Sequence, residues 1–178
     1  MPTEEDLIKE RLRKLADIEK LGINAYPHKY EPKNKASEIL EKYGHLHNEQ
    51  RTDDAVKVAG RIMALRRMGK ASFAHISDET GKVQAYFQFD KLGEKNYNFL
   101  KLLDLGDIIG IEGAIFKTRT GEITIDATNV EILAKSLRPL PEKWHGLKDI
   151  EARYRKRYVD LLMSPDVREV FKKRFDHY

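Results

Sequence analysis

The sequence contains no cysteine among its 178 residues. Disulfide bonds, cysteine-ligated zinc and a thiol nucleophile are therefore excluded, and the absence fits a reducing cytoplasm, which is the location we predict. No apolar run approaches the roughly 20 residues that a membrane-spanning helix needs. The first six residues, MPTEED, are acidic and lead into no apolar stretch. We therefore expect neither a signal peptide nor a membrane anchor.

A large excess of charge of one sign is also missing. The 33 Lys and Arg residues and 29 Asp and Glu residues leave a formal net charge of +4. This small excess permits a polyanionic partner but does not require one. Charged residues make up 35% and hydrophobic residues 40% of the chain. These proportions predict one ordinary domain with flanking elements, a real core and a well-solvated surface.

Residue patterns typical of catalytic and metal sites do not occur either. The sequence has no glycine-rich loop that could cradle phosphates and no pair of catalytic carboxylates. His45 and His47 share a polar stretch without a third ligand nearby, so we interpret them as solvated rather than as a metal pair. We therefore predict no catalytic, cofactor-binding or metal-binding residue in this chain.

Helical periodicity is present in the first part of the chain. Apolar residues recur at helical spacing over residues 3–21, which predicts a helix that ends at Gly22. Thr3 and Asp6 resemble a capping box at its start. A second, short helix is predicted over 37–43. The first helix also has a basic edge, which could face a phosphate backbone but is more simply a solvated face: Lys9, Arg11, Arg13 and Lys14.

From Ala55 the hydrophobic period changes from helical to two, as in β-strands. The first predicted strand begins there, and four more cover residues 71–77, 82–89, 108–117 and 122–133. A short helix is predicted between the third and fourth strands, over 96–103. Three strands, a helix and two strands is the element order of the OB-fold, a five-stranded Greek-key barrel that commonly binds oligonucleotides.

The predicted fold class is therefore mainly β, an OB-fold barrel with an N-terminal helix and a C-terminal helical linker. We divide the chain into an N-terminal helical segment (1–50), the OB-fold domain (51–136) and a linker region (137–178). In the linker region, apolar periodicity predicts a helix over 149–163 and a further helix from Val167.

Alternation along the strands predicts which side chains face outward. In the second strand Ala74 and Ile76 share the core face, which puts Phe73 on the outer face. The same alternation puts Gln84 of the third strand and Glu122 of the fifth outward. Stacking a base on an exposed aromatic ring contributes roughly 1–3 kcal/mol, and an amide can read a Watson–Crick edge. The sequence therefore predicts a face that binds single-stranded nucleic acid.

Neighbouring charges refine this prediction. Arg66, Arg67 and Lys70 lie in the turn before the second strand, where they could hold phosphates. Glu122 can accept a hydrogen bond from a base but repels phosphate, which favours selective reading over a generic strand groove. The alternative for Phe73 is that its ring caps one end of the barrel core.

Several segments of the chain resemble class IIb aminoacyl-tRNA synthetases, in their anticodon-binding domain: VAGR at 58–61, RRMGKASF at 66–73 and GKVQ at 81–84. Others are similar to the lysyl-tRNA synthetases in particular, and together they span nearly the whole chain: AYP at 25–27, DLGD at 104–107, FKTRTGE at 116–122, LRPLP at 137–141 and HGLKDIEARYRKRY at 145–158.

This resemblance implies roles for individual residues. Phe73 would stack on the central uridine of the lysine anticodon, and Gln84 would hydrogen-bond to that base. Glu122 would contact a neighbouring anticodon base. Arg66 would be among the anticodon contacts, and Arg61 is a further candidate. The implied partner is the anticodon loop of tRNA(Lys).

The resemblance also implies an activity for the longer protein, which would attach lysine to its tRNA with ATP and Mg²⁺ and act as a homodimer. The sequence ends where the first class II motif of that family would begin. We therefore expect an N-terminal portion that is inactive alone and dimerises weakly or not at all; a naturally shortened relative is the alternative.

Two other functions stay open. One is a free-standing OB-fold module that binds single strands without sequence preference. The other is a non-binding dimerisation or scaffold domain, whose surface could include Tyr154, Tyr158 and Leu161.

Overall fold

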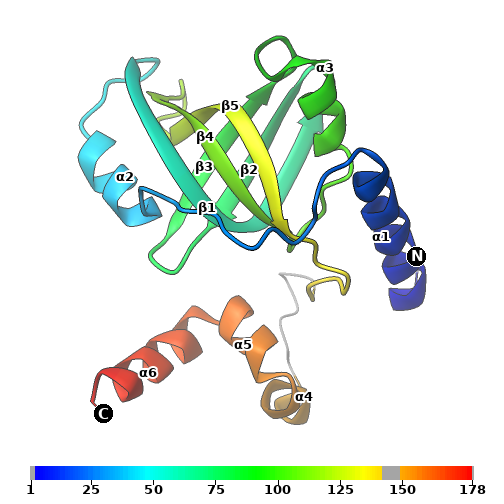
Figure 1. Ribbon diagram of the computed structural model, residues 1–178. Helices are drawn as coiled ribbons and strands as arrows, with labels where there is room; N and C mark the ends of the chain where they lie inside the picture. Colours follow the sequence, from blue (N-terminus) through cyan, green and yellow to red (C-terminus); the bar gives the residue numbers. More distant parts are fainter. Residues whose placement is uncertain (1–2, 142–148, 178) are drawn as a thin grey trace. The chain divides into compact units, whose positions relative to one another are not determined.

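The computed structural model describes residues 3–141 and 149–177 (Figure 1). The chain forms two compact units, Met1–Pro139 and Leu140–Tyr178. The predicted division into three parts is not tested by these two units and stays a prediction. Among the described residues, no helix is both long enough and apolar enough to cross a membrane.

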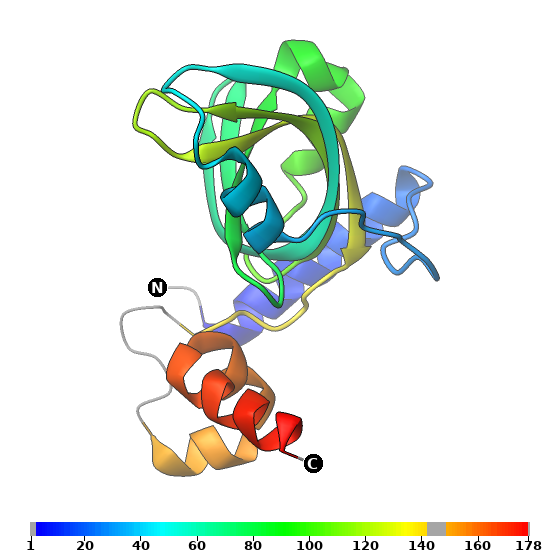
Figure 2. The ribbon, with the colours of Figure 1, turned by 90° about the vertical axis from the view of Figure 1, so that its left-hand side faces the viewer.

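Five strands of the first unit close into a barrel in the order β1-β2-β3-β5-β4, which Figures 1 and 2 show from two sides. Their bounds are Arg51–Met68 (β1), Ala71–Ser77 (β2), Lys82–Gln88 (β3), Ile108–Lys117 (β4) and Ile123–Ala134 (β5). The β3 and β5 strands pair in parallel, and the other four pairings are antiparallel. This architecture confirms the predicted OB-fold barrel.

The long β1 strand closes the barrel because it pairs with two neighbours. Its first part, from Arg51 to Arg61, pairs with β4, and its second part, from Arg61 to Met68, pairs with β2. A register shift between Ile62 and Ala64 lies just after the change of partner. Such irregularities bend a strand and increase its twist, which is what a corner of a barrel requires.

The core of the barrel consists of the side chains that alternate inward along the strands. Ala74 and Ile76 of β2 are buried, as the alternation predicted. All five strands contribute large, fully buried side chains, so the core is shared around the ring: Ile62, Ile76, Phe87, Ile109, Ile111, Ile115, Ile125 and Ile132.

Three helices accompany the barrel: α1 (Glu4–Lys20), α2 (Ala36–Tyr43) and α3 (Phe89–Leu100). The predicted capping box at the start of α1 is confirmed, because the side chains of Thr3 and Asp6 each accept a hydrogen bond from the other's backbone N–H. The α3 helix starts seven residues before the predicted position. Gly93, with φ of 75°, interrupts its first turns, and this break hid them from the periodicity.

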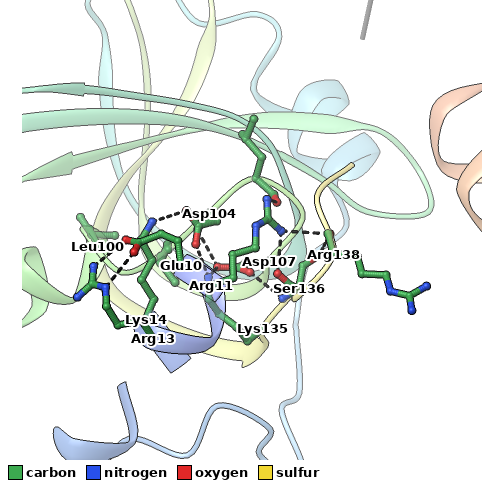
Figure 3. Close-up of polar contacts among 12 residues, drawn as sticks. Glu10, Arg11, Arg13, Lys14, Leu100, Asp104, Asp107, Lys135, Ser136 and Arg138 are labelled. Atoms are coloured by element: carbon green, nitrogen blue, oxygen red, sulfur yellow. Dashed lines mark hydrogen bonds and ion pairs between the residues drawn. The ribbon is translucent and has the colours of Figure 1, made fainter. Parts of the chain in front are cut away.

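Polar contacts fasten α1 to one end of the barrel (Figure 3). The Arg11 guanidinium donates hydrogen bonds to the backbone carbonyls of Leu105, Ser136 and Arg138. Lys14 forms an ion pair with Asp104 at 2.5 Å between Nζ and Oδ1. The basic edge of α1 is therefore partly used within the protein.

The second unit contains α4 (Ile150–Arg155), α5 (Arg157–Met163) and α6 (Pro165–Asp176). The prediction of one continuous helix over 149–163 was wrong, because Lys156 has φ of −111° and ψ of 49°, outside helical geometry. The motif HGLKDIEARYRKRY at 145–158 was part of the family resemblance, and its first four residues, 145–148, lie outside the described residues.

Candidate nucleic-acid interface

The outer face of β2, β3 and β5 brings together side chains from strands that are adjacent in the barrel. Phe73 pairs with Tyr86 across β2 and β3, and His75 pairs with Gln84. Gln84 in turn pairs with Thr124 of the parallel neighbour β5. Residues opposite each other on paired strands share a face, so these five side chains belong to one surface.

A chain of hydrogen bonds crosses this surface, and we call it the outer-face chain: His75, Glu122, Gln84 and Thr124. The distance from His75 Nε2 to Glu122 Oε1 is 2.7 Å, and Gln84 Nε2 donates to Glu122 Oε2 at 2.5 Å. The Thr124 hydroxyl donates to Gln84 Oε1 at 2.9 Å. The structure therefore joins two of the predicted site residues, Gln84 and Glu122, in direct contact.

Gln84 and Thr124 lie beneath their neighbours although they point away from the core. Gln84 is 8% exposed and Thr124 is fully buried. Glu122 and His75 are more open, with side chains 43% and 32% exposed. Glu122 and His75 therefore lie at the rim of this face, and the Gln84 amide lies deeper in it.

Aromatic rings form a row beside the outer-face chain. Phe73 stacks on Tyr86 with ring centroids 4.5 Å apart and planes inclined by 23°. Tyr86 contacts Phe116 of β4 at 6.0 Å between centroids. Phe73 is half-buried and lies outside the hydrophobic core cluster. Its ring therefore belongs to the outer face and does not cap one end of the core.

A buried carboxylate fixes two cations at the far edge of the aromatic row. Asp126 of β5 is 2% exposed and accepts from Arg51 Nη1 at 2.7 Å, Lys91 Nζ at 2.9 Å and Gln88 Nε2 at 3.0 Å. Burial by itself would raise the pKa of Asp126, but these donors outweigh burial and lower it. The Arg51 guanidinium also lies 4.7 Å from the centre of the Phe116 ring.

The two arginines of the predicted site lie in different surroundings. Arg66 is exposed and pairs with Phe73 across β1 and β2, so it flanks the aromatic row. Arg61 donates to the Gly106 carbonyl at 2.7 Å, and burial lowers the pKa of its guanidinium. The structure thus brings Phe73, Gln84, Glu122 and Arg66 to one face, whereas the guanidinium of Arg61 is directed to the loop before β4.

Several residues of this face have no role in the sequence-based site: His75, Thr124, Tyr86, Phe116, Arg51 and Asp126. Strand alternation puts His75 and Tyr86 on the outer face, so the sequence alone could have placed both residues in the predicted site. Phe116 lies on β4, which does not pair with β3, so its contact with Tyr86 could be predicted only from the order of the strands in the barrel. In the described part of the chain, no group of three or more His, Asp or Glu side chains could hold a metal ion.

Comparison with known proteins agrees with this geometry. A family model described as an OB-fold nucleic acid binding domain matches residues 56–133, which run from β1 through most of β5. The barrel is therefore similar to the OB-fold nucleic acid binding domains of this family. The matched segment of the OB-fold domain contains every residue of the outer-face chain and of the aromatic row.

Relatives match the chain beyond the OB-fold domain. The lysine–tRNA ligase of Carboxydothermus hydrogenoformans is 55% identical over 93% of this chain. The lysine–tRNA ligases of Pelotomaculum thermopropionicum and Syntrophomonas wolfei are 49% and 48% identical over 95% of it. These matches confirm the resemblance seen in the sequence motifs. The chain spans about a third of the length of these relatives, in their N-terminal part.

Proposed function

We propose that this chain recognises the anticodon of tRNA(Lys) as the N-terminal part of a lysine–tRNA ligase. The whole protein would attach lysine to that tRNA with ATP and Mg²⁺ in the cytoplasm, and the OB-fold domain would position the tRNA without taking part in the chemistry. The observation that carries this proposal is the contact between Gln84 and Glu122 beside the Phe73 ring, within an OB-fold domain whose relatives are lysine–tRNA ligases.

Phe73 would stack on the central uridine of the anticodon. The ring is already positioned by a neighbour, because it stacks on Tyr86 with 4.5 Å between the ring centroids. A pre-positioned ring loses little conformational freedom when a base binds, which improves affinity. A base stacked on such a ring contributes roughly 1–3 kcal/mol.

The polar contacts would come from the same face. Gln84 would hydrogen-bond to the central base, and Glu122 would contact a neighbouring base. Arg66, which is exposed and opposite Phe73 in register, would be a further anticodon contact. Arg61 is a less favourable candidate, since its guanidinium would first have to leave the Gly106 carbonyl.

Binding of an anticodon stem-loop to the 178-residue chain tests this function. We expect Phe73→Ala to weaken binding by roughly 1–3 kcal/mol, measured by fluorescence anisotropy with a labelled RNA. Phe175→Ala is a matched control, because this ring is 83% exposed on α6 and outside the barrel. Equal affinity of the unmodified chain for stem-loops with different central bases would contradict the proposal.

The aromatic row on the outer face favours one alternative, a module that binds any single strand. Stacking tolerates every base, and such binding weakens steeply with salt. Glu122 argues against it, because a carboxylate at the rim of the face repels a phosphate backbone. A titration with unstructured oligonucleotides separates the two, since the alternative predicts affinities equal to that of the stem-loop.

We also propose that the longer protein is a homodimer and that the present chain associates weakly or not at all. Tyr154 and Tyr158 of the second unit are 70% and 59% exposed, and they could form part of such a surface together with Leu161. Sedimentation velocity over a range of concentrations tests this. A stable dimer of the 178-residue chain would contradict it.

A further inference from the structure

We propose that Glu122 orients the Gln84 amide, that His75 holds Glu122 in place, and that this orientation selects uridine against cytidine. The inference rests on the proposed function, and it assigns Glu122 and His75 a task that the sequence did not indicate. In this role they are positioning residues, which act on the base through Gln84.

The contacts of Glu122 support the first part of this inference, that Glu122 orients the Gln84 amide. Both oxygens of its carboxylate are occupied within the protein, Oε1 by His75 at 2.7 Å and Oε2 by the Gln84 amide nitrogen at 2.5 Å. A carboxylate only accepts hydrogen bonds, so His75 must donate from Nε2. A carboxylate engaged on both sides is suited to holding its neighbours.

The orientation of the Gln84 amide follows from these contacts. If the amide were reversed, its oxygen would face the Glu122 carboxylate, and two acceptors would lie opposite each other. On the other side the Thr124 hydroxyl lies 2.9 Å from the amide oxygen and 3.1 Å from the Glu122 carbonyl oxygen, so the Glu122 carboxylate sets the orientation of the amide and Thr124 is compatible with it. Gln84 is 8% exposed and Thr124 is fully buried, so little water is available to compensate for the reversed amide.

An amide in one orientation can distinguish the two pyrimidines. In the described part of the chain each amide atom of Gln84 makes one hydrogen bond, although the nitrogen carries two hydrogens and the oxygen two lone pairs. One donor and one acceptor thus remain for a base. Uracil presents an N–H donor beside a carbonyl, whereas cytosine presents a ring-nitrogen acceptor beside an amino group, which is the reversed pattern.

A freely rotating amide would satisfy either base by turning over. A fixed amide matches one pyrimidine and opposes the other with donor against donor and acceptor against acceptor. Stacking on Phe73 would set the plane of the base, so the base could not easily tilt to escape the mismatch. A matched pair of hydrogen bonds of this kind discriminates between bases by about tenfold or more.

The test uses two stem-loops that differ only in a uridine or cytidine at the central anticodon position. We expect the 178-residue chain to prefer uridine by about tenfold or more. Glu122→Gln replaces the acceptor-only carboxylate with an amide that tolerates both orientations of Gln84. This variant should reduce the preference to within about twofold, because any contact of Glu122 with a neighbouring base is lost equally for both loops, whereas the freed Gln84 amide favours the cytidine loop alone.

Variants of His75 test whether this residue holds Glu122 in place, and they leave the core intact because the side chain lies on the outer face and is 32% exposed. His75→Leu removes the donor to Glu122 and should lower the preference for uridine, whereas His75→Gln keeps an N–H donor and should restore it. Glu131→Gln is the matched control, because Glu131 is an exposed carboxylate of β5 that lies outside the outer-face chain. It should leave the preference unchanged.

The outcomes separate this inference from the proposed function. If the unmodified chain prefers uridine and Glu122→Gln keeps the same preference, the orienting role of Glu122 is wrong and the function stands. A loss of affinity for both loops by the same factor in Glu122→Gln would also overturn the inference, since it would indicate a direct contact or a structural role only. If the unmodified chain does not discriminate, the proposed function fails together with the inference.

Discussion

At the scale of single residues, a cluster of buried charges lies at the end of the barrel where α1 is fastened (Figure 3). The side chains of Lys135 and Asp107 are fully buried and form an ion pair at 2.8 Å. Lys135 also pairs with Asp104 at 2.7 Å. Asp107 accepts two further hydrogen bonds, from the backbone N–H groups of Asp104 and Ser136. Each charge is therefore compensated by several partners.

Removing the cation of this cluster should destabilise the protein strongly. Lys135→Met leaves two carboxylates close together without their shared donor, and breaking a buried ion pair in this way costs about 3–5 kcal/mol. Equilibrium unfolding in urea measures the change. Lys20→Met is the control, because Lys20 pairs with Asp17 with its side chain 75% exposed, and such surface pairs contribute about 0–1 kcal/mol. Equal effects of the two substitutions would contradict the structural role of the cluster.

The same cluster predicts a loss of stability in acid. Burial alone would raise the pKa of Asp104, but hydrogen bonds from Lys135 and Lys14 outweigh burial and lower it below its ordinary value of 3.8. A carboxyl whose folded-state pKa is lowered stabilises the fold above the unfolded-state pKa, and that contribution is lost as the pH falls through the folded-state pKa.

The free energy of unfolding should therefore differ between the unmodified chain and Asp104→Asn by a constant amount above about pH 5 and by less as the pH falls below 3.8. Urea unfolding of both proteins at a series of pH values gives this difference. A difference that stays constant down to the lowest pH at which the chain is folded would show that Asp104 is not stabilised as an ion.

At the scale of elements, the sequence predicted most of the barrel because the period-two pattern is local. The bounds of β2 and β4 agree with the prediction to the residue. The sequence did not predict the helix break at Lys156, because apolar spacing continues across the break.

The sequence likewise predicted only part of the candidate site. Alternation indicated the outward direction of Gln84, yet its burial depends on Glu122, which precedes β5 and is 38 residues away in the chain. Asp126 of β5 is likewise covered by Arg51 and Lys91, which come from β1 and α3. Long polar side chains folding over an adjacent strand are a tertiary effect that the pattern of a single strand cannot reveal.

The pairing of β4 with β5 predicts the effect of one glycine substitution. A Cβ atom at Gly113 would lie 2.3 Å from the backbone oxygen of Asp126 and 2.8 Å from its carbonyl carbon. Since backbone atoms of a paired strand cannot easily move away, Gly113→Ala should destabilise the fold by about 1–3 kcal/mol or more. Thermal and urea unfolding measure this loss.

Gly81→Ala is the matched control, because its added Cβ would find its nearest neighbour at 3.8 Å, which is ordinary contact. This substitution should change stability by less than about 1 kcal/mol in either direction. If both alanine variants were equally stable, the close approach of β4 and β5 at Gly113 would be wrong.

At the scale of the whole molecule, the buried apolar side chains divide unequally between the two units. Every member of the main hydrophobic core cluster lies between Ile18 and Ile132, within the first unit. The face proposed to bind RNA lies in that unit as well. Among the residues of the second unit that the structure describes, Val159 and Asp160 are buried, and Asp160 accepts hydrogen bonds from Arg153, Arg157 and Ser164. Stability and recognition should therefore both reside in the first unit.

A chain shortened after Pro139 should consequently fold and bind RNA. It keeps the closed barrel, α1 with its contacts to Ser136 and Arg138, and all residues of the outer-face chain. We expect cooperative urea unfolding of this shortened chain by circular dichroism, and stem-loop affinity within about twofold of that of the 178-residue chain. Further truncation after Leu133 removes the Lys135 and Ser136 contacts to the buried carboxylates and should lower stability sharply. Loss of folding already at Pro139, or a loss of affinity of about tenfold there, would show that the helices of the second unit contribute directly to the barrel or to its RNA-binding face.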